Sequence, residues 1–153
     1  MKLVKQAKGN WQYQLAPKEA DLLVKLVNGF PFCKLEPVKI SKTDKDLKAK
    51  EREKLLNESL AEHRRELKKA ALRLISSDKF KAVEKGLLMT LGEEERETLL
   101  QILNYIRVGC WQALGEPEEM HPPLPETDGE DYAYWFLMDL AGYFECGPID
   151  LGD

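Results

Sequence analysis

The sequence predicts a mainly α-helical single domain: a helical bundle of about five helices, including one long charged helix, with an N-terminal β-hairpin packed on it. Apolar residues recur at intervals of three and four along most of the chain, which is the spacing of one helix face. Only a short N-terminal stretch alternates with the period of two that a β-strand requires. A chain of 153 residues is long enough to bury one hydrophobic core.

The β-hairpin is predicted at the start of the chain, where Gly9 and Asn10 supply turn residues that tolerate a positive φ. Trp11, Tyr13 and Leu15 then alternate with polar residues, so their side chains fall on one face of a strand. A two-stranded hairpin is only marginally stable alone. The aromatic side chains are therefore expected to anchor the hairpin on the helices.

Helices are predicted along the rest of the chain from apolar stripes and from the residues that begin and end them. Pro17 suits the first turn of one helix, and Asn28-Gly29 ends it. Thr43 can cap the next helix, and Thr127 with Glu130 forms a capping box before the last one. The predicted helices cover residues 17–28, 44–75, 78–90, 93–114 and 130–145.

The long charged helix has a narrow apolar seam whose residues recur at alternating spacings of four and three, the heptad pattern of a coiled coil. They are Leu56, Leu60, His63, Leu67, Ala70 and Leu74. The first turns of this helix are polar nearly all round. Within the single domain of residues 1–153, residues 39–56 are therefore expected to project or to be partly mobile. We predict an interface, which a homodimer could use, at Leu56, Leu60, His63, Leu67 and Leu74.

Charge is distributed unevenly along the chain, whose formal net charge is −4. Residues 39–81 carry fourteen basic and eight acidic side chains, whereas residues 82–153 carry three basic and sixteen acidic ones. The C-terminal half should therefore repel nucleic acid and anionic lipid. The basic stretch of residues 39–69 mixes opposite charges and has no interleaved aromatic residues, which favours a solvated helix face or a protein partner over nucleic acid.

Most classes of enzyme and cofactor-binding protein find no support in the sequence. The nucleophile-elbow, P-loop, dinucleotide-binding and zinc-protease motifs do not occur. Cys33, Cys110 and Cys146 are odd in number and form no CxxC pair, which indicates reduced thiols rather than a disulfide framework or a zinc ribbon. No stretch approaches the roughly 20 apolar residues of a membrane helix. We therefore expect a cytoplasmic protein with no membrane partner, and assign no catalytic residue, cofactor or metal ligand.

One polar cluster is a candidate site. Arg107 falls among the apolar residues of the predicted 93–114 helix, and an unpaired buried charge is costly. Asp139, on the equally apolar last helix, is the candidate partner, and Asn104 lies one turn before Arg107. The structural interpretation is an interhelical ion pair or a side chain that extends to the surface. The functional interpretation is an arginine that binds an anion or a peptide.

Three segments resemble an uncharacterised bacterial family, a domain of unknown function best represented in actinobacteria. They are WQYQLAPKEADLL (residues 11–23), LLQILNYIR (residues 99–107, continuing to Leu114-Gly115) and YAYWFLMDL (residues 132–140). Together they cover about a third of the chain, and the long charged helix departs from the family pattern. The resemblance implies a helical fold and no established activity. Because members are often encoded beside an adaptor of ATP-dependent proteolysis, it also implies a link to protein quality control.

We interpret the sequence as a non-enzymatic cytoplasmic interaction or regulatory protein. A protein partner or a second copy is expected, because the chain combines a long charged helix with an uneven charge distribution and no motif for chemistry. One alternative is a small enzyme or ligand-binding protein with an unfamiliar site near Arg107. Another is a nucleic-acid-associated regulator that uses residues 39–69.

Overall fold

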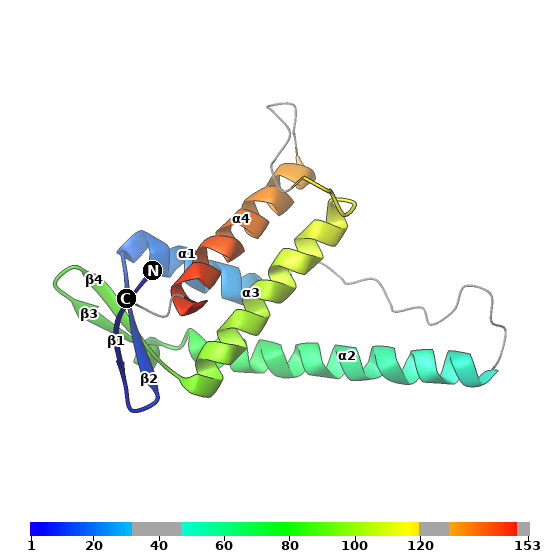
Figure 1. Ribbon diagram of the computed structural model, residues 1–153, viewed down its shortest axis with the longest axis horizontal. Helices are drawn as coiled ribbons and strands as arrows, with labels where there is room; N and C mark the ends of the chain where they lie inside the picture. The colour runs from blue at the N-terminus through cyan, green and yellow to red at the C-terminus, as the bar shows by residue number, and fades with distance from the viewer. Residues whose placement is uncertain (32–46, 120–128, 150–153) are drawn as a thin grey trace.

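The computed structural model describes residues 1–31, 47–119 and 129–149 as a mainly helical fold (Figure 1). The described part contains four α-helices, a short 3-10 helix and one four-stranded antiparallel sheet. In chain order the elements are β1 (Lys2–Ala7), β2 (Asn10–Leu15), α1 (Pro17–Gly29), α2 (Leu47–Leu74), η1 (Ser77–Lys79), β3 (Phe80–Val83), β4 (Gly86–Gly92), α3 (Glu93–Ala113) and α4 (Glu130–Ile149).

The predicted bundle of about five helices is wrong, because the segment predicted as a helix over residues 78–90 forms η1 and the hairpin β3–β4 instead. Phe80, Val83 and Leu87 have helical spacing although they lie on strands, because apolar residues of short strands can also recur at intervals of three and four. Gly86 has a φ of +124°, which a helix does not allow. Met89 and Leu91 are buried and Thr90 between them is half-buried, which is the alternation of a strand.

The sheet has the strand order β1-β2-β4-β3, so the N-terminal hairpin is extended by a second hairpin. In the antiparallel register of the two central strands, Tyr13 lies opposite Met89. These two side chains are buried together with Leu15 and Leu91, so one face of the sheet covers the helices. The predicted anchor Tyr13 is thus fully buried, while Trp11 is half-buried against the core.

The core lies between this sheet face and the four helices, of which α2 contributes only its C-terminal part. Helices α3 and α4 pack side by side in antiparallel directions (Figure 1). The buried face of α3 includes Leu99, Ile102, Leu103 and Ile106, which recur at intervals of three and four as predicted for an amphipathic helix. The core residues of α1 are Ala20, Leu23, Leu26 and Val27. This arrangement fixes the faces of α3 and α4 that carry the candidate site.

Helix α2 leaves this core along its length. Its 28 residues span about 42 Å, and its N-terminal part extends beyond the other helices (Figure 1). Along one helix face, Leu74 is 4% exposed, Leu67 is 5% exposed, Leu60 is half-buried and Leu56 is 40% exposed. The apolar stripe therefore begins inside the core and runs outward. Of the segment 39–56 that was expected to project, residues 39–46 lie outside the described part of the chain.

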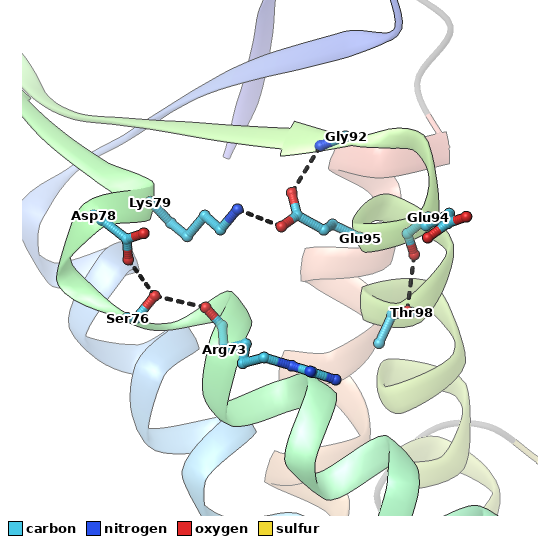
Figure 2. A network of polar contacts seen from close by, with 8 residues as sticks. All are labelled: Arg73, Ser76, Asp78, Lys79, Gly92, Glu94, Glu95 and Thr98. Carbon is cyan, nitrogen blue, oxygen red and sulfur yellow. Dashed lines mark hydrogen bonds and ion pairs between the residues drawn. The ribbon is translucent and has the colours of Figure 1, made fainter.

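The start of α3 is tied to the preceding strand and to η1 by the carboxylate of Glu95 (Figure 2). The backbone N–H of Gly92 donates a hydrogen bond of 2.9 Å to Glu95, which also forms an ion pair with Lys79. Burial raises the pKa of Glu95, but the hydrogen bonds from Lys79 and Gly92 outweigh it and leave this pKa below its usual value. The N-cap residue of α3 is Gly92, and Glu95, at the third position of the helix, supplies the carboxylate that accepts its backbone N–H.

Candidate functional site

A pocket of about 400 Å³ opens beside the C-terminal half of α3. Its walls come from α3, from the loop that follows α3 and from α4. The lining residues are Asn104, Arg107, Val108, Trp111, Glu116, Pro117, Glu118 and Met138. Two residues of the predicted polar cluster, Asn104 and Arg107, are therefore brought to one pocket because they lie one turn apart on α3. The third, Asp139, is exposed and is not part of the lining.

Arg107 forms an ion pair with Glu145 of α4, and not with Asp139 as the sequence suggested. Its Nη1 atom lies 2.5 Å from Oε2 of Glu145. Glu145 is 8% exposed and is the only buried charged residue in the described part of the chain. The side chain of Arg107 is 37% exposed, so the pair joins the protein interior to the pocket wall.

The helical register of α4 explains why Glu145, and not Asp139, faces Arg107. Glu145 follows Met138 by seven residues, two helical turns, and so lies on the same buried face. Asp139 is one residue from Met138, which places it about 100° around the helix. Because α4 is apolar nearly all round, its pattern of residues does not indicate which face is packed. The seven-residue relation to Met138 identifies Glu145 only once the burial of Met138 is known.

The turn after α3 builds the far wall of the pocket. Gly115 adopts a φ of +83°, and its N–H donates to the carbonyl of Gln112, while the N–H of Glu116 donates to the carbonyl of Trp111. These two bonds are those of a Schellman motif, which glycine permits by its positive φ. The indole N–H of Trp111 then donates a 3.0 Å hydrogen bond to the carbonyl of Pro117. This loop is thereby held against the last turn of α3.

The pocket combines an apolar floor with an excess of negative charge. Val108, Trp111, Pro117 and Met138 supply apolar surface. Within the described residues, no hydrogen bond or ion pair engages the other polar side chains of the lining, those of Asn104, Glu116 and Glu118. The charge of Arg107 is already compensated by Glu145. The geometry is that of a binding site with a few polar groups around apolar surface.

The predicted interface on α2 divides into a buried and an exposed part. Leu67 and Leu74 belong to the core of the single chain and cannot contact a partner. Leu56 and His63 are exposed, and the His63 ring lies 6.2 Å from the ring of Tyr105. The accessible part of the predicted interface is therefore its N-terminal part.

The basic residues of α2 are partly neutralised within the chain. Arg65 pairs with Glu62 on the helix surface. The ammonium of Lys68 donates to the carbonyl of Asn28 in α1, and burial lowers the pKa of Lys68. Residues 39–46 of the predicted nucleic-acid stretch 39–69 lie outside the described residues. Residues 47–69, the described part of that stretch, therefore carry basic and acidic side chains close together in the structure, as they do in the sequence.

Residues 1–31, 47–119 and 129–149 contain no candidate metal site. Histidine, cysteine and acidic side chains there form no group of three that could hold a metal ion. Cys110 is buried and Cys146 is exposed, both as free thiols, while Cys33 and His121 lie outside these ranges. None of the helices in these ranges combines the length and apolar character needed to cross a membrane.

Comparison of the chain with protein-family models, with curated proteins and with solved structures found no match. The resemblance to the actinobacterial family, and the link to protein quality control that it implies, stay predictions.

Proposed function

We propose that the chain is an interaction protein that associates with a second copy of itself. The contact is made by the projecting part of α2, residues 47–63, which is the docking segment. The outward course of one apolar stripe carries this proposal. The stripe that is buried at Leu67 continues through the half-buried Leu60 to Leu56, which is 40% exposed. Exposed apolar side chains in line with a core stripe are typical of a surface that a partner covers.

The charges at the start of α2 favour an acidic partner surface. The first turn of this helix contains no acidic residue, and Lys50 lies at its N-terminal end. A helix N-terminus carries a partial positive charge, so a lysine there is locally unfavourable. Carboxylates from a partner would offset both the charge of Lys50 and the helix dipole. Charge complementarity therefore selects an acidic surface near the docking segment.

The C-terminal half of the chain provides such a surface. After Arg107 the sequence contains no lysine or arginine. At the end of the α3–α4 pair, Glu116, Glu118, Glu119 and Asp131 are all exposed. A second copy thus offers carboxylates to the docking segment of the first. If the contact is reciprocal it forms an isologous dimer, and if it is heterologous it can close into a small ring.

Sedimentation velocity over a wide range of protein concentrations tests this proposal. At low salt the protein is expected to associate as its concentration rises, and high salt should weaken association because screening removes the charge attraction. Leu56→Glu should abolish association, since it removes apolar contact and places a carboxylate against an acidic partner. Leu72→Glu is the matched control, because Leu72 lies on another face of α2 and is similarly exposed at 48%.

Two results would contradict the proposal. One is a wild-type protein that stays monomeric at every concentration at low salt. The other is equal loss of association in both leucine variants, which would assign the contact to a different face. Circular dichroism of each variant checks that α2 remains folded, so that a loss of association can be attributed to the surface.

A further inference from the structure

We propose that the pocket beside Arg107 binds a small organic amine, a primary ammonium on an apolar or aromatic body. This inference concerns a cavity on α3 and α4 and does not require self-association, although Glu116 and Glu118 belong both to the pocket lining and to the acidic surface proposed for the docking segment. It rests on the composition of the pocket floor, the unengaged carboxylates at its rim and the compensated charge of Arg107.

The pocket floor selects an apolar body. Val108, Pro117 and Met138 expose aliphatic or thioether surface to a volume of about 400 Å³, which accommodates a small aromatic molecule. The indole N–H of Trp111 is already bonded to the Pro117 carbonyl. Trp111 therefore offers the ligand ring surface and not a donor. Aromatic ring surface attracts both apolar groups and cations.

The rim selects a positive charge. Glu116 and Glu118 both line the pocket, and no other described residue forms a hydrogen bond or ion pair with their carboxylates. A primary ammonium supplies three donors, which match these acceptors. The amide of Asn104, on α3, can offer one further oxygen.

Among the described residues of the lining, Arg107 is the one cation, and it could favour an anion instead. Its guanidinium lies 2.5 Å from the carboxylate of Glu145, so the two charges cancel at the pocket wall. With this pair intact, Glu116 and Glu118 leave the lining with net negative charge. An anionic ligand would approach these carboxylates without a free cation to offset them.

A titration followed by ¹H–¹⁵N correlation spectra of the full chain tests the inference with three matched probes. Phenethylammonium, phenylpropionate and phenethyl alcohol share an aromatic ring and differ in charge. Saturable shifts of the Trp111 indole signal and of the Val108 and Asn104 amides are expected with the ammonium. The carboxylate and the alcohol should bind at least about tenfold more weakly.

Variants identify the carboxylates that provide selectivity. The double variant Glu116→Gln, Glu118→Gln should weaken phenethylammonium binding by about fivefold to thirtyfold, because two exposed charge contacts are lost. The double variant Glu93→Gln, Glu97→Gln removes the same charge from exposed positions of α3 outside the pocket lining, and it should bind like the wild type.

A lysine side chain carries the same ammonium, so blocked lysine (Nα-acetyl-lysine amide) is titrated in parallel. A site for a small free amine binds phenethylammonium more tightly than blocked lysine. Tighter binding of blocked lysine would overturn the assignment. The proposal is also overturned by tighter binding of phenylpropionate, by equal effects of the two double variants, or by the absence of saturable shifts with all probes.

Discussion

The ion pair between Arg107 and Glu145 gives the sharpest test of how α3 and α4 are held together. The side chain of Glu145 is 10% exposed, whereas that of Arg107 is 37% exposed. Removing either partner leaves the charge of the other without compensation. The two substitutions should nevertheless lower the free energy of unfolding by unequal amounts. Arg107→Met leaves a carboxylate that is almost fully buried, while Glu145→Gln leaves a cation that can reach water.

The expected magnitudes follow from this asymmetry. Breaking a fully buried pair costs about 3 to 5 kcal/mol, and exposed pairs contribute about 0 to 1 kcal/mol. Because this pair lies between these limits, Arg107→Met should lower the free energy of unfolding by about 2 to 3 kcal/mol. Glu145→Gln should lower it by about 1 to 2 kcal/mol. The coupling between the two sites in a double-mutant cycle should be about 1 to 2 kcal/mol.

Urea unfolding followed by circular dichroism and by tryptophan fluorescence supplies the four free energies of the cycle. A second cycle between Arg107→Met and Asp139→Asn is the control, because Asp139 lies on the same helix but is exposed. Its coupling should be below about 0.3 kcal/mol. Equal couplings in the two cycles, or a larger loss from Glu145→Gln than from Arg107→Met, would refute the reasoning.

Three further outcomes are expected from single substitutions measured by urea unfolding. Glu95→Gln should lower the free energy of unfolding by about 1 kcal/mol at neutral pH, after allowance for solvent screening. Folding lowers the pKa of Glu95, so the wild type has its full advantage above the pKa of the unfolded state. This advantage disappears as the pH falls through the pKa of the folded state. Gly86→Ala should cost about 2 to 4 kcal/mol, since φ is +124° and the new Cβ would lie 2.3 Å from a carbonyl oxygen of β2. Leu67→Ala should lower the free energy of unfolding by about 2 to 5 kcal/mol, whereas Leu56→Ala on the same stripe should lower it by less than about 1 kcal/mol. Equal losses in the two variants would show that the stripe does not leave the core.

The helices were predictable because each buries one face, and a helical stripe is a local pattern. The predicted helix over residues 93–114 is the observed α3, Glu93–Ala113. The hairpin β3–β4 was not predictable in the same way. Its apolar residues fit both periods, and the pairing that decides between them is with β2, which lies far away in the sequence. The φ of Gly86 is a second nonlocal constraint, because this glycine packs against the backbone of Leu15.

The candidate site shows the same division between local and nonlocal information. Asn104 and Arg107 could be grouped from the sequence because one helical turn separates them. Glu116 and Pro117 join them through the backbone turn at Gly115 and the hydrogen bond from Trp111, which no pattern of side chains announces. The partner on α4 could not be chosen, because the helix is apolar on most of its surface and its packed face is set by α3.

The ion pair and the proposed amine site make one joint prediction, because the compensation of Arg107 is what leaves the pocket negative. In Glu145→Gln the guanidinium loses its partner, and its full charge faces the pocket. Phenethylammonium should then bind about threefold to tenfold more weakly and phenylpropionate more tightly by a similar factor, which Asp139→Asn should not reproduce. If Glu145→Gln is less stable but binds the two probes with the same relative affinities as the wild type, Arg107 does not contribute to the charge of the site. The selectivity would then have to come from Glu116 and Glu118 alone.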